Sequence, residues 1–176
     1  RGFAYIARPC SDYDRALALY EEACALAEGT DACGGAGGTQ IPGDGGAQRP
    51  KRDQARELYE GARSMFERVG DVSGEAACVQ GLGDLALSRS DDREARARYE
   101  EARDLYKKVG FALGEASCIQ SLGEIARKRL RLLEAKTHYK HGLKVYEQIG
   151  DPYSIGLANA RLAHVSWHVW FAIGYN

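Results

Sequence analysis

A forty-residue internal repeat constrains the fold of this chain more than any other feature of its sequence. Residues 53–92 align without a gap to residues 93–132, and a third copy continues in register after residue 132. The shared positions in the first copy are Ala55, Tyr59, Ala62, Gly74, Glu75, Ala76, Cys78, Leu82 and Gly83. A period of this length is typical of stacked helical hairpins, in which neighbouring units bury each other's apolar faces.

Each copy predicts two helices. Apolar residues recur every three or four positions from about residue 93 to 108, and again from about 112 to 128, which is the spacing of a helix with one buried face. Gly110 ends the earlier helix, because glycine adopts the left-handed conformation without steric cost. In the last copy Asp151 is a good N-cap and Pro152 fits the first helical position.

The order of residues along these helices resembles the tetratricopeptide repeat. That family places a large apolar residue, a Leu-Gly pair and a small residue on its first helix, and then Ala, an aromatic residue and Ala on its second. The matching residues here are Ile119, Leu122, Gly123 and Ala126, followed by Ala135, Tyr139 and Gly142. The family's unit is usually about 34 residues. The forty-residue form found here is similar to the repeats of the LGN/Pins polarity adaptors and of many bacterial and fungal tetratricopeptide arrays.

The resemblance covers residues 53–163 and implies an all-α fold, an α-α superhelix (solenoid) of antiparallel helix pairs. We expect such helical repeats over residues 51–170 and a short tail at 171–176. Residues 1–27 fit the template as a truncated repeat, with the end of a first helix at Phe3–Ala7 and a second helix at Asp14–Ala27.

Residues 28–50 break the pattern. Eight of these 23 residues are glycine and two are proline. Glycine lowers helix stability by about 1 kcal/mol per position relative to alanine, and proline by about 3 kcal/mol. We therefore expect a loop or flexible linker here rather than a helix. The segment contains no G-x-x-x-x-G-K-[ST] sequence, which argues against a phosphate-binding loop.

The composition excludes several classes of function. With 24 basic and 25 acidic residues the net charge is -1, which gives no reason to expect binding to nucleic acid or to an anionic membrane. The five cysteines are odd in number and form no C-x-x-C pair, which favours a reducing, cytoplasmic setting. Cys78 and Cys118 occupy equivalent apolar positions, and we expect both to be small buried residues.

Two histidine pairs are the strongest candidates for a metal site. His164 and His168 are four residues apart, and His138 and His141 are three apart, so each pair can share one helical face. Neither pair belongs to an H-E-x-x-H sequence, and ordinary polar positions are the favoured interpretation. No Ser-His-Asp or Cys-His arrangement is apparent, so the sequence predicts no enzyme and no cofactor.

The C-terminal end is aromatic where a solenoid usually has a polar cap. It contains Trp167, Trp170, Phe171 and Tyr175, on a segment that extends the last helix beyond the point where earlier copies turn. Three interpretations stay open: the end packs back on the preceding hairpin, meets a further repeat, or mediates self-association.

The resemblance also implies a binding surface, because in that family the first helix of each pair lines a concave groove. The non-buried inward positions predicted for that groove are Gln80, Asp84, Gln120, Glu124, Arg127, Lys128, His164 and Trp167. Glutamine can hydrogen-bond the backbone of an extended segment, while Glu124 and Arg127 would select its charges. The lysine and asparagine pattern of repeats that capture a C-terminal carboxylate is not found at these positions.

We therefore expect a protein-interaction scaffold whose partner is a protein or peptide. The bound segment would be internal, extended or helical, and of some basic character. The alternative is a ligand- or peptide-sensing module of a larger regulator.

Overall fold

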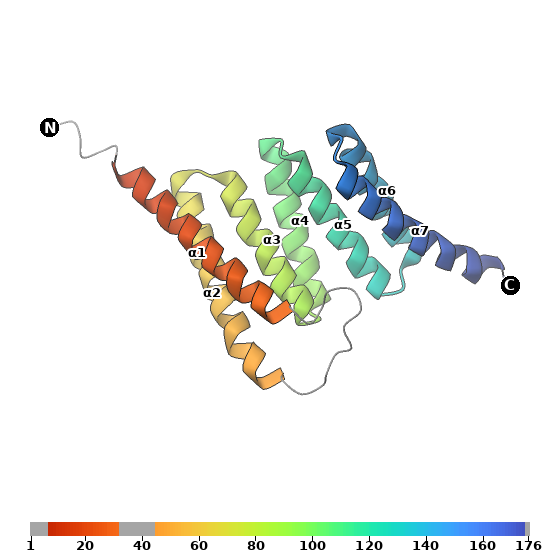
Figure 1. Cartoon of the computed structure of the whole chain (residues 1–176), viewed down its shortest axis with the longest axis horizontal. Coiled ribbons are helices and arrows are strands. Elements are labelled where there is room, and N and C mark those ends of the chain that lie inside the picture. Colours follow the sequence, from red (N-terminus) through yellow and green to blue (C-terminus); the bar gives the residue numbers. More distant parts are fainter. Residues whose placement is uncertain (1–6, 32–44, 175–176) are drawn as a thin grey trace. The chain divides into compact units, whose positions relative to one another are not determined.

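The computed structural model describes residues 7–31 and 45–174, and the regular secondary structure in these ranges is entirely helical (Figure 1). The helices are α1 (Ala7–Asp31), α2 (Gly45–Val69), α3 (Val72–Ser88), α4 (Asp92–Val109), α5 (Ala112–Lys128), α6 (Leu132–Ile149) and α7 (Pro152–Gly174). They pack sequentially in antiparallel pairs, which confirms the predicted all-α class. None of the described helices combines the length and apolar character needed to cross a membrane.

The chain divides into two compact units, residues 1–95 (unit 1) and residues 96–176 (unit 2). In unit 1, α1 packs along α2, α2 packs along α3, and α1 also contacts α3. Its core consists of two clusters of buried residues, which are Ala23, Ala55, Tyr59, Leu82 and Leu85 in one and Ala16, Ala62, Phe66 and Cys78 in the other. In unit 2, α6 packs against both α5 and α7.

The prediction for the N-terminal repeat is wrong in two respects. α1 runs without a break from Ala7, although the sequence predicted a second helix beginning only at Asp14. The remaining part of the expected first helix, residues 3–6, lies outside the described residues. Moreover, α1 packs against α2 and α3, and this is the position of a first helix rather than a second. Buried Ala16 and Ala23 specify which face of α1 is covered, but not which helix covers it.

The predicted loop at 28–50 is wrong for residues 28–31 and 45–50, which are helical. α1 continues to Asp31 and α2 begins at Gly45, while residues 32–44 lie outside the described part of the chain. Pro50 lies inside α2 and is exposed. Proline removes one backbone hydrogen bond from a helix, which lowers the stability of the helix but does not prevent it from forming. The rest of α2 buries Ala55, Tyr59, Ala62 and Phe66, and this burial offsets that cost.

Small residues set the distance between helices. A Cβ atom added at Gly81 of α3 would lie 2.6 Å from the ring of Tyr59, and one added at Gly123 of α5 would lie 2.7 Å from the ring of Tyr139. Both contacts are too short for a real side chain. Each tyrosine ring therefore packs directly on a glycine backbone. Gly123 is a repeat position shared with Gly83, whereas Gly81 is replaced by Ser121 in the next copy.

The turns between helices repeat as well. Gly70, Gly110 and Gly150 adopt φ values of 77°, 72° and 78° after α2, α4 and α6. After α3 and α5 the left-handed residues are Ser90 and Leu130, with φ values of 59° and 58°. The predicted cap of the last helix is confirmed, because the Asp151 carboxylate accepts from the backbone N–H of Tyr153 and α7 begins at Pro152.

Two further predictions concern the buried cysteines and the C-terminal tail. Cys78 and Cys118 are both fully buried, as expected. α7 extends to Gly174, so residues 171–174 of the predicted tail are helical. The helix does extend beyond the length of its counterpart α5, as the sequence indicated.

Candidate functional site

The structure distributes the predicted groove residues over three helices. Gln80 and Asp84 lie on α3 in unit 1, where Gln80 is half-buried and Asp84 is exposed. The other six lie in unit 2, namely Gln120, Glu124, Arg127 and Lys128 on α5 and His164 and Trp167 on α7. Since α5 and α7 both pack on α6 and run in the same direction, unit 2 carries the larger part of the predicted surface.

Gln120 does not occupy the non-buried position that the sequence predicted. Its exposed fraction is 3%, and its amide oxygen accepts a hydrogen bond of 2.6 Å from the guanidinium of Arg161 on α7. Gly142 of α6 makes the room, because a Cβ atom there would approach the Gln120 side chain to 3.1 Å. The Gln120 amide nitrogen is buried and has no partner among the described residues. Arginine only donates, so the amide oxygen must be the atom that faces it.

Glu124 and Arg127 form a fixed pair one turn further along α5. Two nitrogens of the Arg127 guanidinium donate to the two Glu124 carboxylate oxygens, over 2.9 and 2.5 Å. The hydroxyl of Tyr139 on α6 donates to the same carboxylate over 2.9 Å. Burial alone would raise the pKa of Glu124, but the hydrogen bonds from Arg127 and Tyr139 outweigh it and lower that pKa. Glu124 is therefore ionised and already neutralised by its neighbours.

Arg161 is the residue that the sequence analysis missed. Its side chain is half-buried, and no carboxylate among the described residues pairs with it. The earlier copies hold Gly81 and Ser121 at this position. The signal that could have revealed it is a single guanidinium on a segment, residues 152–174, that contains no Lys, Asp or Glu.

The next candidates are the histidine pairs, which the sequence singled out as possible metal ligands. The rings of His164 and His168 meet edge to face, with their centroids 4.6 Å apart. Within the described residues, no group of three or more His, Cys, Asp or Glu side chains is placed to hold a metal ion. Both histidines and Trp167 are exposed on α7.

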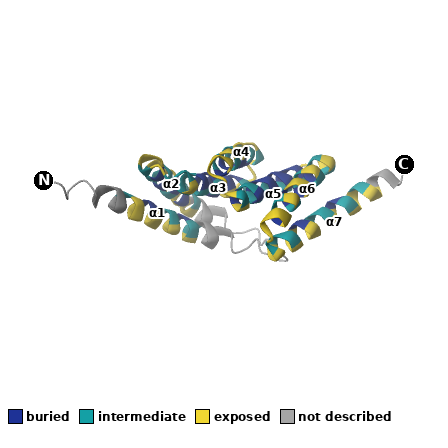
Figure 2. Ribbon diagram, turned by 90° about the horizontal axis from the view of Figure 1, so that it is seen from above, coloured by how far each residue is buried: buried dark blue, intermediate teal, exposed yellow. Residues whose placement is uncertain are grey.

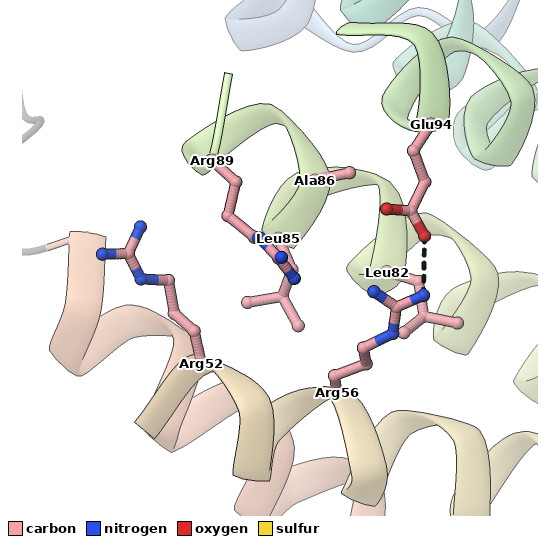
Figure 3. A pocket seen from close by; sticks show the side chains of 7 residues that line it. All are labelled: Arg52, Arg56, Leu82, Leu85, Ala86, Arg89 and Glu94. Atoms are coloured by element: carbon pink, nitrogen blue, oxygen red, sulfur yellow. Dashed lines mark hydrogen bonds and ion pairs between the residues drawn. The ribbon is translucent and has the colours of Figure 1, made fainter. Parts of the chain in front are cut away.

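Unit 1 contains an arginine pocket that sequence reasoning did not identify (Figure 3). It is a small hollow, open to solvent, and lined by Arg52, Arg56, Leu82, Leu85, Ala86, Arg89 and Glu94. Arg56 is paired with Glu94 at 2.8 Å, and Arg89 lies 3.9 Å from Asp53. The pocket combines apolar side chains with three arginines, of which Arg56 and Arg89 lie near carboxylates.

Comparison with known proteins gives one match. Residues 49–108 match the family model of the tetratricopeptide repeat, which spans most of α2, all of α3 and nearly all of α4. No curated protein matches the chain. The similarity covers residues 49–108 and implies a protein-protein interaction module there, of a kind that is typically a non-catalytic scaffold.

Proposed function

We propose that this chain is a scaffold that binds an extended or helical peptide segment on the α5/α7 surface of unit 2, and that the segment presents a carboxylate to Arg161. The observation that supports this proposal concerns Arg161, which is half-buried and whose guanidinium, among the described residues, hydrogen-bonds the neutral amide of Gln120 and no carboxylate. A carboxylate can accept two parallel hydrogen bonds from a guanidinium, and this is among the stronger polar contacts in proteins.

The charge of the surface favours an acidic segment over the basic one that the sequence suggested. Glu124 was expected to attract basic residues, but its carboxylate is occupied by Arg127 and Tyr139. Lys128 is exposed at the end of the same helix. The surface therefore carries an excess of positive charge, and an acidic partner is attracted to it.

Gln120 has a different role in this proposal from the one expected. It is buried beneath Arg161 and cannot reach the backbone of a bound segment. Its amide oxygen instead holds the guanidinium in place, which lowers the entropy that Arg161 would lose on binding. Gln80 and Asp84 lie on α3 in unit 1 and are not part of this proposed surface.

A pair of peptides tests the proposal. The probe is the tightest acidic sequence selected from a random peptide library, compared with the same sequence in which every Glu and Asp is replaced by its amide. We expect fluorescence polarisation to show tighter binding of the acidic form, and Arg161→Gln to weaken it by about tenfold, which corresponds to about 1.4 kcal/mol. Arg93→Gln, which removes an exposed cation from α4, serves as the matched control.

Two results would contradict the assignment. One is equal affinity for the acidic peptide and its amide counterpart. The other is an Arg161→Gln variant that keeps full affinity while its helical content is unchanged.

A further inference from the structure

The exposed side of α7 carries several large apolar residues. Its exposed fractions are 80% for Tyr153, 63% for Trp167, 51% for Phe171 and 40% for Leu157. The opposite side of the helix is covered, because Ala158 and Val165 are fully buried in clusters with residues of α5 and α6. Figure 2 shows exposed and buried residues alternating along α7. The predicted possibility that the aromatic end packs back on the preceding hairpin is therefore wrong for Trp167 and Phe171.

These residues follow a regular spacing. Tyr153, Leu157, Ala160, His164, Trp167 and Phe171, which we name the α7 seam, are successively four, three, four, three and four residues apart. All six are exposed. Alternation of four and three is the spacing by which one helix packs against another in a coiled coil. The seam is thus shaped for a helix and not for an extended strand.

We propose that a second copy of this chain covers the seam, with the two α7 helices antiparallel. The spacing is symmetric about the point midway between Ala160 and His164. An antiparallel partner therefore places Tyr153 opposite Phe171, Leu157 opposite Trp167, and Ala160 opposite His164. A two-fold interface requires this kind of self-complementarity, in which each contact occurs twice. Large side chains meet at the ends of the seam, and the smallest one faces the imidazole at its centre.

The charges of α7 fit this occupant. Arg161 is the only Lys, Arg, Asp or Glu within residues 152–174 and lies outside the seam, so antiparallel pairing brings no like charges into direct opposition. Helices that lie on membrane surfaces are instead rich in Lys and Arg on their polar side. The absence of such residues favours a protein helix over a lipid surface.

The available area suits a reversible dimer. A buried Phe, Tyr or Trp side chain covers about 150–250 Å², so the exposed parts of the four large seam residues amount to roughly 500 Å² per copy. Two copies would bury roughly 1,000 Å² in total, which is near the lower limit for a specific interface. We expect association that depends on concentration rather than a permanent dimer.

Sedimentation equilibrium of the chain tests this inference. Between about 1 and 200 µM we expect the mass to rise from the 19.2 kDa of one chain towards twice that value. Trp167→Glu should remain monomeric throughout, with unchanged helical content by circular dichroism. Leu133→Glu, which changes an exposed apolar residue of α6, is the control and should still associate.

A mixing experiment tests the antiparallel register. Leu157→Glu and Trp167→Lys variants should each be monomeric alone but associate when mixed, because the new charges face each other only in the antiparallel pair. Four outcomes would overturn the inference. They are a wild-type chain that stays monomeric at the highest concentration, a Trp167→Glu variant that still dimerises, a mixture that does not associate, or a monomer that uses Trp167 to bind phosphatidylcholine vesicles. None of these depends on whether Arg161 binds a peptide, so failure here is distinguishable from failure of the proposed function.

Discussion

Arg56 of α2 and Glu94 of α4 form an ion pair of 2.8 Å in unit 1, and Arg96 and Glu134 form the same pair at 2.8 Å in unit 2. Each pair joins one second helix to the next, and both members are displaced by forty residues between the units. The sequence repeat is therefore also a repeat of contacts. Each arginine and glutamate is only partly exposed, so solvent screens the pair less than it would at an open surface.

A double-mutant cycle measures the contribution of this contact to stability. We expect Arg56→Ala and Glu94→Ala to couple by about 0.5–1 kcal/mol in the free energy of unfolding, from urea denaturation. The pair between Arg103 and Asp104, whose carboxylate is 61% exposed, is the comparison and should couple more weakly. Coupling that is the same at both sites would show that burial does not strengthen the repeated pair.

The glycine contacts predict a contrast within one residue type. Gly123→Ala should lower the free energy of unfolding by about 1–3 kcal/mol, because the new Cβ atom would lie 2.7 Å from the ring of Tyr139. Gly156→Ala is the control, since nothing lies within 4 Å of the Cβ position at this helical residue. Alanine is the better helix former there, and a gain of about 0.5–1 kcal/mol is expected. Thermal denaturation of both variants measures this contrast. An equal change in the stability of the two variants would contradict the packing argument.

The sequence predicted the fold best where residues of the repeat determine their own contacts. Tyr139 packs on Gly123, which is also a glycine (Gly83) one copy earlier, because a bulky ring requires a residue without a side chain opposite it. The N-terminal third is different. Ala16 and Ala23 are as small as the alanines of a second helix, and small residues allow close approach to either neighbour. The spacing of residues within α1 therefore does not determine that α1 packs against α2 and α3 in the position of a first helix.

The candidate site was less predictable because its geometry depends on pairs that are distant in sequence. Helical periodicity places Gln120 on the groove side of α5, yet Arg161, which lies forty-one residues later, covers it. The pairing of Glu124 with Arg127 could be foreseen from their spacing of three residues. The contribution of Tyr139 to the same carboxylate depends on the packing of α6 against α5.

The left-handed conformation of Leu130 gives a third prediction. Its φ of 58° is unfavourable for a residue with a side chain, and the side chain is almost fully exposed. Leu130→Gly should therefore stabilise the protein by about 0.5–1 kcal/mol, measured by urea denaturation. Lys140→Gly, at an exposed position within α6, should destabilise it by about 1 kcal/mol. A loss of stability in Leu130→Gly would mean that the leucine makes contacts worth more than its backbone strain.

Buried acidic groups predict a loss of stability in alkali. Burial raises the pKa of Cys78 from 9.0 to about 12, and burial also raises the pKa values of Tyr59, Tyr139 and Tyr146 above 10.0. A group whose pKa is higher in the folded state favours folding fully below its unfolded pKa and loses that contribution as the pH rises towards its folded pKa. The free energy of unfolding should thus be steady from about pH 7 to 8.5 and fall above about pH 9.

The size of the alkaline effect can be stated for single residues. Cys78 should contribute a loss of about 1.4 kcal/mol for each pH unit above its unfolded pKa, and each buried tyrosine should add a similar slope above about pH 10. Urea denaturation at about pH 8 and about pH 10.5 measures the difference. In Tyr139→Phe the drop between these two values should be smaller than in the wild-type chain, because one titrating hydroxyl is gone. Its stability at the lower pH should also be reduced by about 0.5–1.5 kcal/mol, because Glu124 loses a hydrogen-bond donor. An equal drop in both proteins would show that the Tyr139 hydroxyl reaches solvent and ionises in the folded state.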